Sequence, residues 1–140
     1  MEVSIDSILA LVGVIVVGVA LLVVFATVNK GASLDKEKYR ADWLEIENNI
    51  KKNNIATYQF AILSADKLLD RALMQSGVKG NTMGERLKNC GKSINNIDSV
   101  WAAHKIRNKI AHEISVDLSV RVAERMLSVY KKALKDVGAI

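Results

Sequence analysis

The stretch between Asp6 and Lys30 carries no charged residue, and it constrains the fold more than any other feature of the chain. Residues 8–28 are nearly all Val, Leu, Ile, Ala or Gly. As a helix they rise roughly 30 Å, about 1.5 Å per residue, which matches the hydrocarbon core of a bilayer. A cleaved signal peptide is the rival interpretation, but it needs a basic start and a shorter apolar core. We therefore expect an uncleaved single-pass membrane anchor over residues 1–29.

The charges that flank this segment predict its orientation. No Lys or Arg precedes it, whereas Lys30, Lys36, Lys38 and Arg40 follow it closely. Because basic flanks stay on the cytoplasmic side, we expect the N-terminus outside the cell membrane and the C-terminal domain in the cytoplasm.

The rest of the chain is long enough for one compact domain but not for two. We expect a linker over residues 30–35 and the domain over residues 36–138. Pro is absent and Gly occurs 8 times in 140 residues, which favours helices over a many-stranded sheet. One Cys and two His indicate no metal site, and we expect no cofactor. We interpret Cys90 as a small, half-buried residue.

The charge of the domain is positive. All 20 Lys and Arg follow position 29, whereas Glu2 and Asp6 among the 15 acids precede it, so this part carries a formal +7. Such a domain attracts polyanions, either nucleic acid or the anionic inner face of a membrane. Solubility and membrane orientation are the simpler explanation of the same excess.

Apolar residues recur with helical spacing, which predicts helices over residues 34–52, 54–76, 97–111 and 118–137. A short helix follows a capping box in which Thr82 and Glu85 cap each other's amides, and Ser33 is the expected N-cap of the first domain helix. Expected core positions include Val122 and Ile114, with Trp43 and Trp101 as further anchors. The fold class is therefore all-α, an N-terminal transmembrane helix followed by a four- to five-helix bundle.

The densest polar cluster spans residues 104–113 (HKIRNKIAHE). Arg107 and His112 are about 500° apart on an ideal helix, so their side chains diverge by roughly 140° unless the helix loosens or the long Arg reaches around. Asn108 shares a face with His112, and Lys105 lies on the same side. We interpret His104 as an interior or flanking residue.

Residues 107–112 (RNKIAH) match the R-N-x-x-x-H form of the R-x(4–6)-H motif, and the chain thereby resembles HEPN domains (higher eukaryote and prokaryote nucleotide-binding). Residues 61–70 resemble the second helix of that family, residues 80–87 a turn seen upstream of the motif, and the last helix the closing helix. The similarity covers residues 36–137.

The resemblance implies a HEPN-like bundle that forms a homodimer with two facing motifs, binds RNA and, as in active members, cleaves it without metal. Arg107 would hold the phosphate, His112 would be the acid/base and Asn108 a polar helper. Lys105 and Lys109 would hold flanking phosphates. Some members carry a modified Tyr two residues after the motif His; here that residue is Ile114.

Structural alternatives remain open for the motif. Arg107 can pair with Glu113, or with Asp66 or Asp70 across the bundle, and His112 can serve as a helix C-cap. A functional alternative is a non-catalytic helical module, tethered to the membrane, that dimerises or docks a protein partner there. A nucleotide-sensing module is a third hypothesis.

Overall fold

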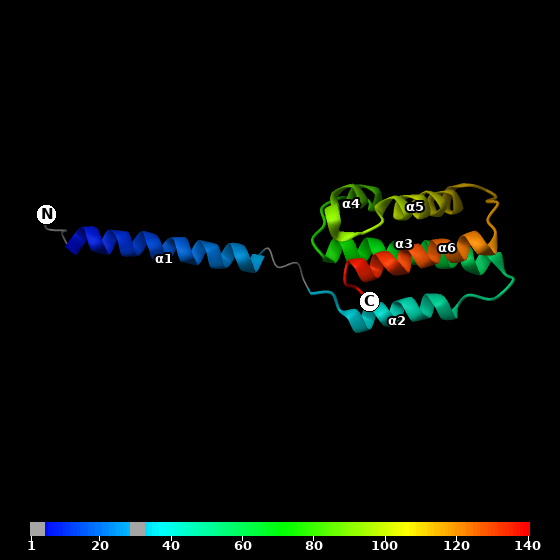
Figure 1. Ribbon diagram of the computed structural model, residues 1–140, viewed down its shortest axis with the longest axis horizontal. Coiled ribbons are helices and arrows are strands. Elements are labelled where there is room, and N and C mark those ends of the chain that lie inside the picture. The colour runs from blue at the N-terminus through cyan, green and yellow to red at the C-terminus, as the bar shows by residue number, and fades with distance from the viewer. Residues whose placement is uncertain (1–4, 29–32) are drawn as a thin grey trace. The chain divides into compact units, whose positions relative to one another are not determined.

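The computed structural model describes residues 5–28 and 33–140, and the chain divides into two compact units, Met1–Gly31 and Ala32–Ile140 (Figure 1). Residues 1–4 and 29–32 lie outside the described residues. The predicted linker over residues 30–35 and the flanking Lys30 therefore fall partly or wholly outside that description.

The first unit consists of helix α1, Ile5–Val28, which begins just before Asp6 and is otherwise uncharged. Its segment Ile5–Phe25 is long and apolar enough to cross a membrane, and none of it is buried inside the structure. A helix that is apolar on all sides needs a surrounding apolar phase, because no face of it tolerates water. The prediction of an N-terminal helix able to span a membrane is therefore confirmed.

The second unit is a helical bundle, which confirms the predicted all-α class. Its helices are α2 (Lys36–Asn48), α3 (Ile55–Gln75), α4 (Met83–Asn89), α5 (Ile97–His112) and α6 (Val120–Asp136), with a 3-10 turn at Gly91–Ser93. Among residues 33–140 no strand is present. The five helices agree with the expected four- to five-helix bundle.

The helix starts follow from capping side chains. Asn54 accepts from the amide of Ala56 at 3.1 Å, and Ser119 accepts from the amide of Val122 at 3.3 Å. The prediction of Ser33 as a cap is wrong: Asp35 begins α2 by accepting from the amide of Lys38 at 3.1 Å.

The expected capping box is formed only in half. Thr82 accepts from the amide of Glu85 at 3.2 Å, as predicted. The carboxylate of Glu85 instead accepts from the amide of Asn81 at 2.6 Å, one residue before the expected partner.

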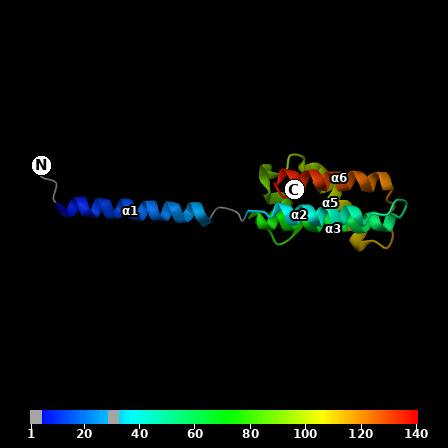
Figure 2. The same cartoon turned by 90° about the horizontal axis from the view of Figure 1, so that it is seen from below.

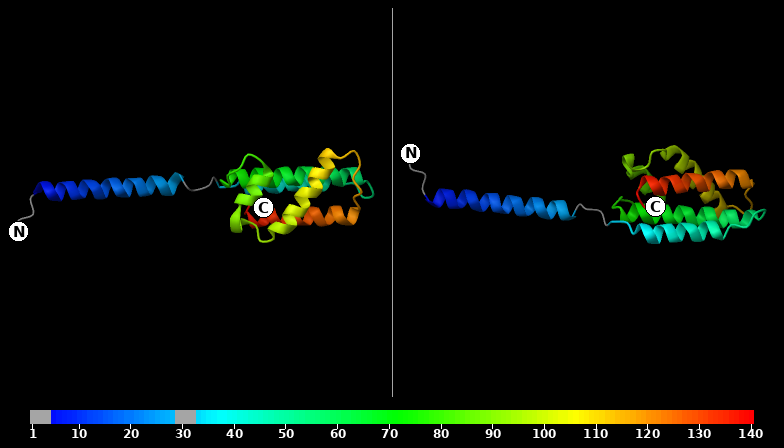
Figure 3. Two further views of the ribbon diagram at one scale, coloured as in Figure 1. Left: turned by 90° about the horizontal axis from the view of Figure 1, so that it is seen from above. Right: turned by 60° about the horizontal axis from the view of Figure 1, so that its bottom comes forward.

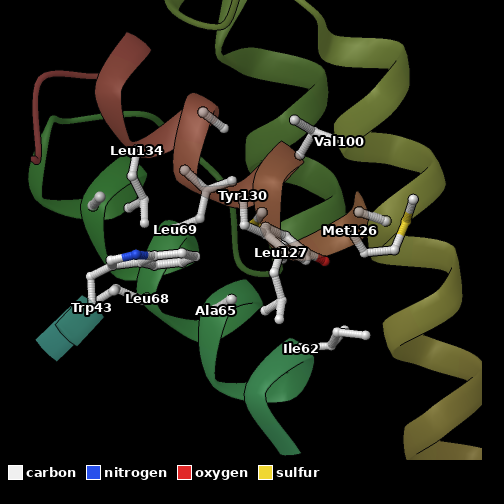
Figure 4. Close-up of a cluster of buried hydrophobic side chains, with 14 of the residues drawn as sticks. Trp43, Ile62, Ala65, Leu68, Leu69, Val100, Met126, Leu127, Tyr130 and Leu134 are labelled. Carbon is white, nitrogen blue, oxygen red and sulfur yellow. The ribbon is translucent and has the colours of Figure 1, made fainter. Parts of the chain in front are cut away.

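Helix α3 is the centre of the bundle, because it contacts α2, α4, α5 and α6. Figure 2 shows α2 alongside α3, and Figure 3 shows α5 crossing α3 and α6 obliquely. Most apolar side chains of α3 are buried, and Figure 4 shows its Ala65, Leu68 and Leu69 packed against Trp43 of α2 and the side chains of α6. This close packing of α3, α5 and α6 positions the polar residues described below.

Three expectations about burial need correction. Val122 is 38% exposed, because the buried stripe of α6 runs instead through Ala123, Met126 and Tyr130. Ile114 is fully exposed, because α5 ends at His112 before reaching it. Cys90 is buried rather than half-buried.

Candidate functional site

Helix α5 places three polar side chains on one face. His104, Arg107 and Asn108 are spaced i, i+3 and i+4, so they lie side by side along the helix. His104 is buried, and Arg107 and Asn108 are half-buried. Ala103, fully buried next to them, lets the helix pack closely on the bundle. The motif residues Arg107 and Asn108 therefore lie at the edge of the bundle, partly covered and partly open to solvent.

The partner of this face is Asp66 of α3, which is 2% exposed. Asp66 lies between the buried Ala65 and Leu69, so its carboxylate enters the core. A charge at that depth requires hydrogen-bonding or ionic partners, since burial of an unpaired carboxylate is costly. Asp66 obtains them from both α5 and α6.

Four side chains close a ring of polar contacts. Nδ1 of His104 lies 2.7 Å from Oδ1 of Asp66, and Nε2 of His104 lies 3.3 Å from Nδ2 of Asn108. Nη1 of Arg107 donates to Oδ1 of Asn108 at 3.0 Å. Nε of Arg107 lies 3.2 Å from Oδ2 of Asp66, which returns the ring to its start.

The last contact in the ring is an ion pair without hydrogen-bond geometry. Nε of Arg107 is buried and makes no hydrogen bond to any described residue, although it lies within ion-pair distance of Asp66. The Arg107 side chain is 32% exposed. Its guanidinium is thus anchored at the inner edge and accessible at the outer one.

Helix α6 adds a further donor to the cluster. The hydroxyl of Tyr130 donates to Oδ1 of Asp66 at 3.0 Å. Figure 4 shows the aromatic side chain of Tyr130 extending from α6 into the interior. Burial, and then the charge of Asp66, raise the pKa of Tyr130 far above that of a free phenol. Tyr130 therefore remains a protonated donor to Asp66.

A surface cavity of about 450 Å³ opens over the ring. Asp66, Asp70, His104, Arg107 and Asn108 are among its lining residues, together with Lys67, Thr82, Met83 and Gly84. Asp70 is paired through both carboxylate oxygens with Arg86, at 2.6 and 3.0 Å. Of the three acidic partners considered for Arg107, the structure therefore pairs it with Asp66.

The remaining motif residue, His112, lies apart from this cluster. It is exposed and is the last residue of α5. The helix does not loosen before it, because the amide of Glu113 still donates to the carbonyl of Lys109 at 2.8 Å. Within one chain Arg107 and His112 thus keep the divergence of roughly 140° expected for an ideal helix. Lys105 and Lys109 are also exposed, one turn apart on α5.

Two residues of the cluster were not predicted as site residues. Asp66 was expected only as one possible partner of Arg107, and Tyr130 lies in the last helix, which was compared with the family's closing helix as a whole. Their signal was a polar residue within an apolar stripe: Asp66 stands in the series Ile62, Leu69, Leu73, all fully buried. A carboxylate in such a series indicates buried donors nearby.

The chemistry open to this arrangement is the binding of anions and the transfer of protons. The cluster offers the accessible edge of a guanidinium and a half-buried amide, and the end of α5 adds the imidazole of His112 and two lysines. Among residues 5–28 and 33–140 no three His, Cys, Asp or Glu side chains gather as metal ligands.

Comparisons of the chain with protein-family models, with curated proteins and with solved structures returned no match.

Proposed function

We propose that the domain is a membrane-anchored, HEPN-like module that binds RNA at α5 in the cytoplasm and cleaves it without metal. The observation that carries this proposal is the anchored guanidinium of Arg107, which is 32% exposed beside Asn108 and a cavity. Lys105, Lys109 and His112 are exposed on a different side of the same helix, and they add positive charge and an acid/base group there.

The proposed reaction uses the 2′-hydroxyl of RNA as its nucleophile. His112 accepts the proton of that hydroxyl, the 2′-oxygen bonds to phosphorus, and the bond from phosphorus to the 5′-oxygen breaks. The leaving 5′-oxygen takes up a proton from the protonated imidazole of His112. The products are a 2′,3′-cyclic phosphate and a 5′-hydroxyl end, and Arg107 stabilises the charge on the phosphoryl oxygens.

The divergence of Arg107 and His112 supports a homodimer as the active form. Two side chains that leave one helix about 140° apart do not readily reach the same phosphate. If two copies meet through α5 about a two-fold axis, Arg107 of one copy and His112 of the other lie across a shared cleft. The two sites are then equivalent by symmetry.

The test uses the fragment from residue 30 onward, which contains the compact unit Ala32–Ile140. The fragment is incubated with RNA in chelator beside His112→Ala and Arg107→Lys, with the exposed Lys132→Ala as a charge control. We expect both motif variants to lose cleavage and Lys132→Ala to retain it. A folded wild-type fragment that neither cleaves RNA nor binds it in a salt-sensitive way would contradict the proposal and favour a non-catalytic interaction module.

A further inference from the structure

The ring around His104 admits one arrangement of protons. Arg107 only donates hydrogen bonds and a carboxylate only accepts them. The oxygen of Asn108 therefore faces Nη1 of Arg107, and its Nδ2 faces Nε2 of His104, at 3.0 and 3.3 Å. Since Nδ2 is a donor, Nε2 of His104 carries no proton and accepts the hydrogen bond. The single ring proton sits on Nδ1, which donates to Asp66 at 2.7 Å.

His104 thereby links the buried charge to the motif. Asp66 accepts a hydrogen bond from Nδ1 of His104, which leaves Nε2 as an acceptor for the side-chain amide of Asn108. The edge of Trp101 adds a contact, with ring centroids 6.0 Å apart and planes at 77°. The consequence is that Asn108 presents its oxygen, and not its amide hydrogens, to Arg107.

We propose that His104 is a positioning residue of the RNA site, which sets the direction of the hydrogen bonds that orient Arg107 and Asn108. This inference rests on the proposed function. It separates the roles of the two histidines: His112 at the exposed end of α5 is the acid/base, whereas His104, buried and held at both nitrogens, acts through Asn108. An apolar residue at position 104 would leave Nδ2 of Asn108 without its acceptor, so that Arg107 alone would hold the side-chain amide in place.

Two variants separate this role from simple packing. In His104→Gln the side-chain amide offers a donor group and an acceptor group, so it can replace both nitrogens of the neutral imidazole. His104→Leu fills a similar volume and offers neither. Leu134→Ala, at a fully buried apolar position of α6, serves as a matched control for lost stability.

The experiment measures RNA affinity of the fragment from residue 30 onward at a temperature where circular dichroism shows each variant folded. We expect His104→Leu to bind RNA about tenfold more weakly, which corresponds to the free energy of one hydrogen bond to a charged group. His104→Gln should recover most of the lost affinity. Leu134→Ala should melt earlier yet bind as the wild type does. Equal affinity of His104→Leu and wild type, or equal losses in His104→Leu and Leu134→Ala, would overturn the positioning role.

A second measurement needs no substitution at all. Long-range nitrogen–proton spectra of the wild-type fragment report which nitrogen of His104 carries the proton. We expect the Nδ1–H form and a sharp Nε–H signal of Arg107 that shifts when RNA is added. A proton on Nε2 overturns the inference even if RNA binds. A wild-type fragment that binds no RNA overturns the proposed function and this role together. The two failures are distinguishable because the position of the proton and the binding of RNA are measured separately.

Discussion

Asp66 is the residue on which the polar interior depends, since it receives His104, Tyr130 and Arg107 at a site that is 2% exposed. Removal of a buried charge partner leaves its donors without an acceptor. The cluster therefore contributes to stability through the completeness of its contacts rather than through the ion pair alone.

We predict that Asp66→Ala lowers the free energy of unfolding by about 3 kcal/mol, because Arg107 and Tyr130 lose their common partner. Tyr130→Phe should cost about 2 kcal/mol, the loss of one hydrogen bond to a charged group. Urea unfolding of the domain fragment measures both.

A matched control for this pair is Tyr58→Phe. The hydroxyl of Tyr58 lies 3.4 Å from Oε1 of Glu124, a long contact at the edge of the core. We expect a loss below about 1 kcal/mol. If Tyr130→Phe costs no more than Tyr58→Phe, the hydrogen bond to Asp66 has no special role in stability.

Cys90 makes a separate prediction at the residue scale. Its thiol is buried and lies 3.3 Å from the carbonyl of Leu87. Burial raises the pKa of Cys90, so the reactive thiolate is disfavoured in the folded domain. We expect alkylation by iodoacetamide at pH 8 to be at least about tenfold slower in the folded domain than in urea. Mass spectrometry follows the reaction, and equal rates would show that the thiol is accessible.

At the scale of elements, α1 carries the prediction of orientation. We expect protease to digest the domain in inverted membrane vesicles but not in intact cells, because Lys30, Lys36, Lys38 and Arg40 follow α1 and no basic residue precedes it. A variant with Glu2→Lys and Asp6→Lys, and with Gln at those four basic positions, should insert the opposite way. Digestion of the wild-type domain in intact cells would contradict the assignment.

The helices were predictable because their signals are local. The apolar spacing of α3, with Asn54 at its start and Gly77 after its end, is contained in one stretch of sequence, and its bounds agree to within a residue. The wrong predictions concern the ends of helices and the edges of their buried faces. Asp35 and Ser33 are both good caps two residues apart, and Val122 lies just outside the stripe that α6 buries.

The candidate site was predictable only in part, because its contacts are distant in sequence. The spacing of Arg107, Asn108 and His112 is local, and it correctly indicated that Arg107 and His112 point apart. The contacts of Asp66 with His104 and Tyr130 bridge 38 and 64 residues. No local pattern selects among Asp66, Asp70 and Glu113 as the partner of Arg107; the packing of α3 on α5 and α6 does.

The whole molecule makes a prediction if two copies share each site. Arg107→Lys and His112→Ala chains are each expected to be inactive, yet a mixture of the two should recover about a quarter of wild-type cleavage. Half of the dimers in an equal mixture are mixed, and one of the two sites in each mixed dimer is intact. Recovery in the mixture, measured with the fragment at high concentration, supports a shared site. A mixture as inactive as its components would show that each site belongs to one chain.

The bare surface of α1 has a consequence for how often two copies meet. A chain held by such a helix diffuses in a sheet rather than in a volume, so the density of copies per membrane area replaces their molar concentration. Weakly associating domains that stay apart in dilute solution then encounter one another repeatedly, already aligned by the plane that holds them. If the domain acts as a dimer, the number of anchored copies per area of membrane sets the fraction that is paired.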